Sequence, residues 1–263
     1  MTSSGSTESS NLVELPEGLD AANLKNRTDW PMDRIAQRLC LGCGPLFMVV
    51  FGAGFILAGW LPPPDPQRDA AAVAAVFQED TTRIRVGMLL CMLGGGLIAP
   101  WAVTISAQLR RTEGRFPVLT YAQLACGILV TAYVMLSAII WAIAAFRPSD
   151  YQADTVQMLN DLAWFLFLIP FPPFVLWCAA VAVAILRDPH EVPVFPRWAG
   201  YFNVWAALAV APAGLIMFFK SGPFAWNGFV AFYVAIGAFF GWIVVMTVLV
   251  ARAINDESRR AAA

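Results

Sequence analysis

The sequence predicts an all-α membrane protein, a polytopic bundle of six transmembrane helices whose N- and C-termini both lie in the cytoplasm. Hydrophobic residues make up 59% of the chain and charged residues 13%, whereas a soluble domain carries roughly a quarter charged residues. Six apolar segments reach or exceed the ~20 residues that cross a bilayer as a helix. We therefore expect one membrane bundle and no soluble domain.

The bundle is expected over residues 39–253, between a disordered or amphipathic cytoplasmic tail at 1–38 and a second cytoplasmic tail at 254–263. Its spans are predicted at about 39–61, 84–108, 118–146, 160–186, 199–219 and 227–252. A short helix is also expected over 69–80 in the first outer loop. The reason is that Val73, Val76 and Phe77 recur at helical spacing after a proline-rich turn that cannot be helical.

Positive charge sets the expected orientation. With the N-terminus inside, the cytoplasmic segments hold twelve Lys and Arg residues and the outer segments hold five. This distribution fits the positive-inside rule.

Two neighbouring spans carry prolines near their middles. Pro170, Pro172 and Pro173 lie inside the fourth span, where they remove helical hydrogen bonds and must break or kink the helix. Pro212 does the same in the fifth span. In transporters such breaks often mark a binding site, but neighbouring helices can also satisfy the freed carbonyls.

These features predict an apolar ligand site between the second, fourth and fifth spans. A hydrophobic or aromatic ligand is expected, because the spans offer almost no charge to a polar solute. Ordinary core packing also explains the same residue types. The predicted site residues are Pro170, Phe171, Pro172, Pro173, Phe174, Trp177, Gly94, Gly95, Met92, Trp205 and Pro212.

A polar cluster is predicted at the outer ends of the spans. Asp161 opens the fourth span, Arg83 and Arg85 enter the second, and Lys220 follows the fifth. These four side chains either close a vestibule or are ordinary solvated loop charges.

The residues needed for common membrane chemistry are scarce. The chain has one histidine, His190, whereas membrane haem and non-haem iron sites need several. Cys40 and Cys43 lack further zinc ligands nearby and are read as packing thiols. We therefore predict no catalytic residue, no cofactor and no metal site, and an interfacial enzyme would have to use Asp161, His190, Glu191 or the arginines.

Six stretches of the chain stand out as motifs: TTRIRVGM (81–88), QLRRTEG (108–114), NDLAWF (160–165), PFPPF (170–174), VFPRWAGYFNVWAAL (194–208) and KSGPFAWNG (220–228). In these stretches the chain resembles a family of uncharacterised six-span bacterial integral membrane proteins, and more distantly the DUF4386 type. The resemblance implies six spans and a bacterial cytoplasmic (inner) membrane location, and it implies no activity.

Three functional classes follow. The first is a non-enzymatic membrane protein that binds or passes a hydrophobic small molecule or lipid. The second is an accessory subunit of a larger membrane complex, and the third is an interfacial membrane enzyme. The expected partners are membrane lipids, a hydrophobic small molecule, and a membrane protein or second copy of the chain. Nucleic acid is not expected, since the net charge is only −1.

Overall fold

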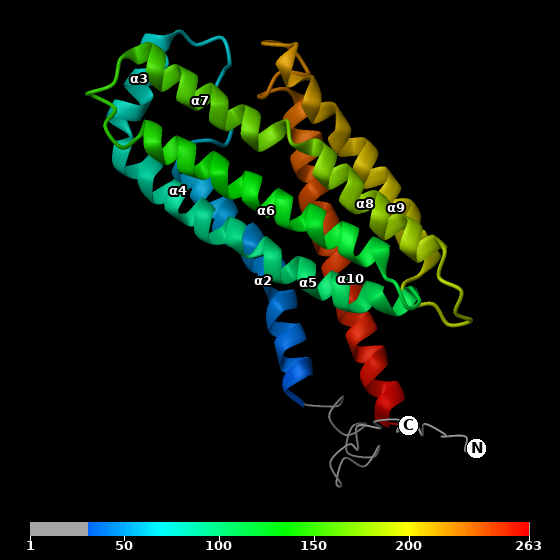
Figure 1. The fold of residues 1–263 in the computed structure, drawn as a ribbon. Helices are drawn as coiled ribbons and strands as arrows, with labels where there is room; N and C mark the ends of the chain where they lie inside the picture. The colour runs from blue at the N-terminus through cyan, green and yellow to red at the C-terminus, as the bar shows by residue number, and fades with distance from the viewer. Residues whose placement is uncertain (1–30, 263) are drawn as a thin grey trace, which may run out of the picture. The chain divides into compact units, whose positions relative to one another are not determined.

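The computed structural model, which describes residues 31–262, is all-helical, with 78% of the chain in helix. Six helical segments of the described residues are long and apolar enough to cross a membrane, which confirms the predicted fold class and makes the chain a multi-pass membrane protein (Figure 1). These segments are Arg34–Leu57, Thr81–Thr112, Val118–Ala144, Ala153–Leu186, Arg197–Met217 and Phe229–Glu257.

Several of these spans are built from two consecutive elements. The helices are α2 (Pro31–Leu57), α3 (Ala70–Glu79), α4 (Thr81–Gly96), α5 (Ile98–Leu109), α6 (Val118–Ala144), α7 (Ala153–Leu168), α8 (Phe171–Leu186), α9 (Arg197–Val210) and α10 (Ala235–Ala262). A 3-10 segment, Ala211–Met217, extends α9, and a π-helical segment, Phe229–Val234, leads into α10.

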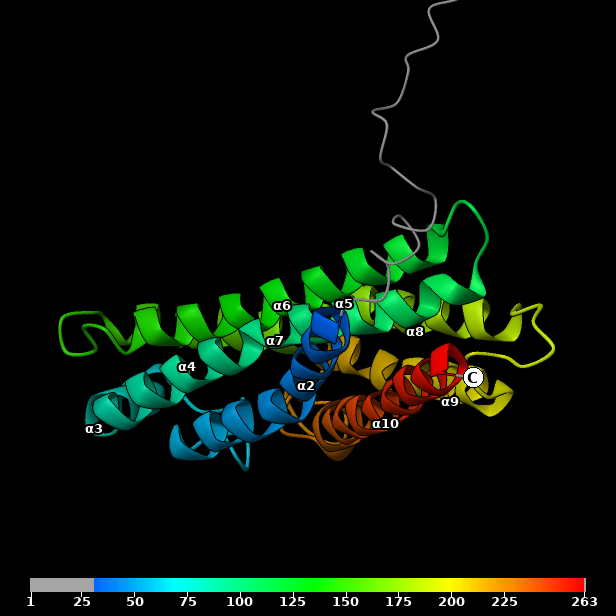
Figure 2. The same ribbon diagram turned by 90° about the horizontal axis from the view of Figure 1, so that it is seen from below.

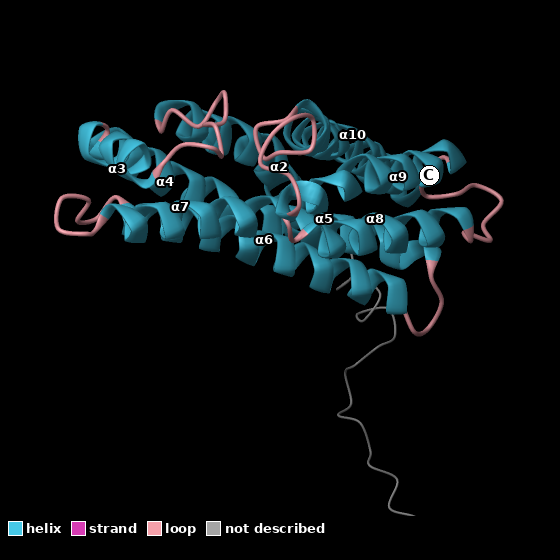
Figure 3. Ribbon diagram, turned by 90° about the horizontal axis from the view of Figure 1, so that it is seen from above, coloured by secondary structure: helices cyan, strands magenta, loops and turns pink. Residues whose placement is uncertain are grey.

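The compact unit Gln37–Ala263 contains the helical bundle. In it, α6 packs against α4, α5, α7 and α8, while α9 packs against α8 and α10. Figures 2 and 3 show α2 and α10 on the side of this assembly that faces away from α6. We call the end where α2 ends and α4 and α7 begin the α3 end of the bundle, because α3 lies there (Figure 1).

The two ends of the chain differ from expectation. Helix α2 begins at Pro31, inside the segment expected as a tail, and residues 1–30 lie outside the described residues. Helix α10 continues through 254–262, where a tail was predicted. A helical extension beyond the apolar part of a span needs partners, and α10 has them.

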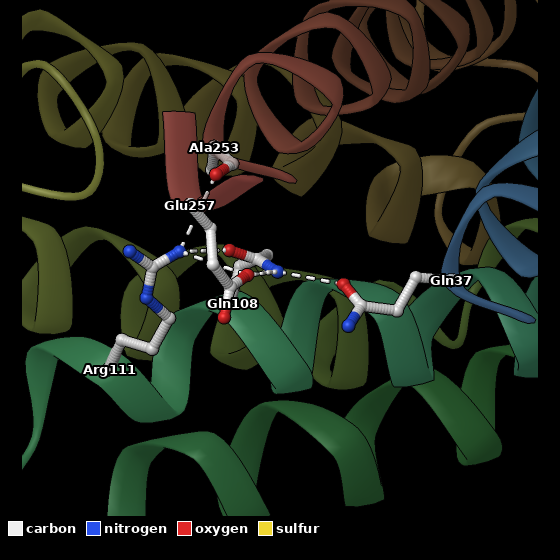
Figure 4. A network of polar contacts seen from close by, with 5 residues as sticks. All are labelled: Gln37, Gln108, Arg111, Ala253 and Glu257. Atoms are coloured by element: carbon white, nitrogen blue, oxygen red, sulfur yellow. Dashed lines mark hydrogen bonds and ion pairs between the residues drawn. The ribbon is translucent and has the colours of Figure 1, made fainter. Parts of the chain in front are cut away.

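A polar network holds that extension to the rest of the bundle (Figure 4). Gln108 on α5, only 1% exposed, donates to Gln37 at 2.9 Å and to Glu257 at 3.3 Å. Arg111 donates to Gln108 at 2.6 Å, pairs with Glu257 at 3.4 Å and reaches the carbonyl of Ala253 at 3.5 Å. The network therefore ties α2, α5 and α10 together beyond the apolar part of α10.

Glycines allow α2 and α4 to approach closely. A Cβ built on Gly54 would lie 2.6 Å from the carbonyl oxygen of Gly87, and a Cβ on Gly87 would lie 2.6 Å from the carbonyl oxygen of Gly54. The two backbones thus touch directly, as small residues permit between membrane helices.

We expect Gly87→Ala to destabilise the protein by about 1–3 kcal/mol, because the added methyl group would force the two helices apart. The thermal midpoint in detergent should fall accordingly. Gly42→Ala on α2 is the matched control, since its Cβ would meet nothing within 4 Å. An unchanged midpoint for Gly87→Ala would contradict the close contact.

Candidate functional site

An apolar cavity of about 150 Å³ lies among α2, α6, the junction of α7 and α8, the 3-10 segment and α10. Ten of its 21 lining residues are aromatic. The aromatic lining residues are Phe47, Phe51, Phe55, Tyr133, Phe167, Phe171, Phe174, Phe232, Phe239 and Phe240.

The break in the fourth span forms one wall of the cavity. Helix α7 ends at Leu168 and α8 begins at Phe171, so the predicted break is confirmed. The N–H of Phe171 donates to the carbonyl of Ile169 at 2.6 Å, which satisfies one of the carbonyls that the prolines would leave bare. Pro170 and Phe171 line the cavity at this point.

Helix α2 forms the opposite wall. Phe47, Phe51 and Phe55 follow at intervals of four residues and therefore share one helix face; all three are buried. Gly52 also lines the cavity, and a Cβ built on it would meet nothing within 4 Å. The glycine leaves open space that a larger side chain would fill.

A cluster of three tryptophans packs behind the cavity wall at Phe174, on the side away from the α3 end. The ring centroids of Trp101, Trp177 and Trp242 lie 5.0–5.9 Å apart in edge-to-face contacts, and each residue is at most 1% exposed. The cavity-lining Phe174 packs edge-on against Trp242 at 5.1 Å. On the side of Phe174 away from the α3 end, these tryptophan rings therefore fill the interior of the bundle.

Each indole N–H of this cluster has its own acceptor. Trp101 donates to Thr247 at 3.0 Å, Trp177 donates to Gln123 at 2.7 Å, and Trp242 donates to Asn203 at 2.7 Å. Gln123 in turn donates to the hydroxyl oxygen of Ser106. Buried polar groups in hydrocarbon must be paired in this way.

The structure brings only part of the predicted ligand site together. Pro170, Phe171 and Phe174 line the cavity. The residues predicted with them that do not line it are Pro172, Pro173, Trp177, Gly94, Gly95, Met92, Trp205 and Pro212.

The glycines of the second span serve helix packing instead. A Cβ on Gly94 would lie 2.9 Å from the backbone nitrogen of Phe51, and one on Gly95 would lie 3.0 Å from Val134. Trp205 is 54% exposed and faces away from the bundle interior, because it lies on the outer face of α9. Sequence reasoning missed the α2 phenylalanines, although their four-residue spacing is a signal for a shared face.

A second, polar pocket of about 170 Å³ lies at the α3 end. The proline-rich loop after α2, helix α3, the middle of α7 and the loop that carries Trp226 form it. Its polar lining residues are Asp65, Arg68, Asn160 and Asp161, together with Trp60 and Trp226.

The four residues of the predicted outer polar cluster do not pair with one another. Arg83 pairs with Asp80 at 3.0 Å. Arg85 donates to the carbonyls of Ala145 and Phe146 at 2.9 and 2.6 Å, where a cation is favourable at the end of α6. Asp161 lines the polar pocket, and Lys220 lies near enough to interact with it electrostatically.

His190 is engaged within its own loop. Its Nδ1 lies 2.6 Å from the carboxylate of Asp188, and that carboxylate also accepts from the backbone N–H groups of His190 and Val194. Burial alone would raise the pKa of Asp188, but these hydrogen bonds outweigh it and hold the pKa below the usual value. The carboxylate therefore fixes the turn between α8 and α9.

The sign of this shift gives a pH prediction. The pKa of Asp188 is lower in the folded protein than in the unfolded chain. The stability that the ionised carboxylate contributes is therefore fully present above pH about 3.9, the ordinary pKa of aspartate, and it is lost as the pH falls through the folded pKa. The Val194 amide should stay protected from hydrogen exchange at pH 5 and lose protection only below the ordinary aspartate range, after correction for intrinsic exchange.

Asp188→Ala should raise exchange at the Val194 amide about ten-fold or more at neutral pH, since hydrogen bonds to charged groups are worth about 1.5–3 kcal/mol. Glu191→Gln, an exposed change in the same loop, is the control. Equal protection in Asp188→Ala and the wild type would show that the carboxylate does not fix the turn.

No protein-family model, curated protein or solved structure matches the chain. The resemblance to six-span bacterial membrane proteins therefore stays a prediction, and function has to be inferred from the cavity and the pocket.

Proposed function

We propose that this protein is a non-enzymatic membrane protein that binds a hydrophobic small molecule or part of a lipid in the aromatic cavity. The observation that carries the proposal is the cavity of about 150 Å³ with an almost entirely apolar wall. Engineered apolar cavities of roughly 150 Å³ stay dry and bind benzene. The cavity thus suits an aryl ring or a short stretch of hydrocarbon.

The closed side of the cavity favours binding over passage. Trp101, Trp177 and Trp242 fill the interior beyond Phe174 and are locked by three hydrogen bonds. A ligand that crossed the bundle would have to break those bonds. A ligand that enters from the α3 end, where the lining residues Ile56 and Leu61 are exposed, meets no such barrier.

The proposed location is a bacterial cytoplasmic membrane, with both termini inside. Arginines support this orientation, because they gather at the bundle end opposite α3. The positively charged residues at that end are Arg38, Arg110, Arg111, Arg115, Arg187, Arg197, Arg252 and Arg259, against Arg68, Arg83, Arg85, Arg147 and Lys220 at the α3 end. The positive-inside rule then places the α3 end outside.

Photolabelling tests the cavity directly. A small aryl diazirine, trifluoromethyl phenyl diazirine, should label peptides containing Phe51, Phe55 or Phe167 in the protein held in lipid nanodiscs. Gly52→Leu should reduce that labelling about ten-fold, a loss equivalent to ~1.4 kcal/mol of binding, because the new side chain fills the open space beside Gly52.

Gly42→Leu is the matched control, since Gly42 also lies on α2 with open space at its Cβ and does not line the cavity. Its labelling should equal that of the wild type. Equal labelling in Gly52→Leu and Gly42→Leu would show that the probe reacts from the surrounding lipid, and the proposed function would fall.

Reporter fusions test the orientation. A green fluorescent protein fused to the C-terminus of the full chain should fluoresce in a bacterial host, and alkaline phosphatase at the same position should be inactive. Fluorescent protein matures in the cytoplasm and phosphatase matures outside it. An active phosphatase with a dark fluorescent protein would reverse the proposed orientation.

A further inference from the structure

The polar pocket and the aromatic cavity lie along the same face of α7. Asn160 and Asp161 line the pocket, and residues 167 and 168, seven positions later, line the cavity. A spacing of seven residues returns to the same face about two turns on, roughly 10 Å along the helix. The two sites are thus stacked from the α3 end inward.

The turn after α2 joins them as well. Leu61 lines the cavity, while its neighbours Trp60 and Pro62 line the pocket. The wall of the apolar site and the wall of the polar site therefore adjoin at this turn.

Two buried donors without partners lie at this boundary. Among the described residues, the indole N–H groups of Trp60 and Trp164 are buried and have no hydrogen-bond acceptor in the protein. Trp60 is 2% exposed and lines the pocket. Trp164 stacks on the pocket residue Trp226 at 5.9 Å and meets the cavity residue Phe55 edge-on at 6.0 Å.

Such orphan donors point to a missing acceptor. Buried N–H groups are nearly always paired, and one left unpaired is costly. The other tryptophan on the pocket wall, Trp226, does have an acceptor, the carbonyl of Pro64 at 2.8 Å. A ligand oxygen in the pocket would give Trp60 the kind of acceptor that Trp226 already has.

The charges around the pocket favour a ligand without net charge. Asp65 and Asp161 are opposed by Arg68 in the wall and by Lys220, which lies outside the wall and acts on Asp161 electrostatically, so both signs are present in equal number. Asp161 takes part in one hydrogen bond among the described residues, a long one of 3.4 Å from Asn160. Its carboxylate is free to accept from a ligand hydroxyl.

We propose that the ligand is an amphiphile whose uncharged, hydroxyl-bearing head occupies the polar pocket and whose apolar end occupies the cavity. This inference rests on the proposed function and specifies its ligand class. An oxygen of the head accepts from Trp60, a hydroxyl of the head donates to Asp161, and the hydrocarbon lies against the phenylalanines below.

Competition against the aryl diazirine tests the head group. Octane, octanoate, octylamine and monooctanoylglycerol share a hydrocarbon end of similar size and differ in the head. In nanodiscs, monooctanoylglycerol should protect the cavity peptides at about a ten-fold lower concentration than any of the others, since the added contacts are equivalent to one or two net hydrogen bonds.

Trp60→Phe should weaken protection by monooctanoylglycerol about three- to ten-fold, because the N–H donor is lost from the pocket wall. Protection by octane should not change, because Trp60 does not line the cavity. Trp205→Phe, an exposed tryptophan that lines neither site, is the matched control and should change neither value. The order in which the four compounds compete is measured on the wild-type protein. It therefore tests the head group even if Trp60→Phe fails to fold.

The outcomes separate the two proposals. If the cavity is not labelled at all, or is labelled regardless of Gly52→Leu, the proposed function fails. If the cavity is labelled specifically but octane competes as well as monooctanoylglycerol, the polar pocket takes no part and this inference fails alone. Strongest competition by octanoate or octylamine would overturn the uncharged head group.

Discussion

The hydrogen-bonded cluster of Trp101, Trp177 and Trp242 is the contact on which the rest of the bundle depends. Its rings come from α5, α8 and α10, and its acceptors lie on α6, α9 and α10. Helix α2 joins through Gly44, where a Cβ would lie 2.5 Å from the Trp101 ring. All six spans thus meet at one group of side chains.

This arrangement follows from the solvent. Apolar side chains gain little by leaving lipid for a protein interior, so membrane helices associate through close packing and through polar groups that need partners. An indole supplies both a large packing surface and one N–H that must be satisfied. The half of the bundle around the cluster is accordingly well filled.

The half of the bundle toward the α3 end is built differently. The break between Leu168 and Phe171 moves α8 off the axis of α7, and the space beside it remains as the aromatic cavity. Above it, Trp60 and Trp164 keep unpaired N–H groups. In one half of the bundle the buried indole N–H groups are all paired, and in the other half two are not. This difference is the physical basis for placing a ligand in the second half.

The sequence alone determined the fold class, the approximate spans, the helix in the first loop and the break in the fourth span. Each of these is encoded locally, because apolar length, helical spacing and the missing N–H of proline act over a few residues. The candidate site could be predicted only in part. Pro170, Phe171 and Phe174 were within reach of sequence reasoning because they lie at the break itself. Only the tertiary structure decided that Phe51 and Phe55 face that break, that Gly94 serves packing, and that Trp60 is left without an acceptor, since each depends on which distant helix lies opposite.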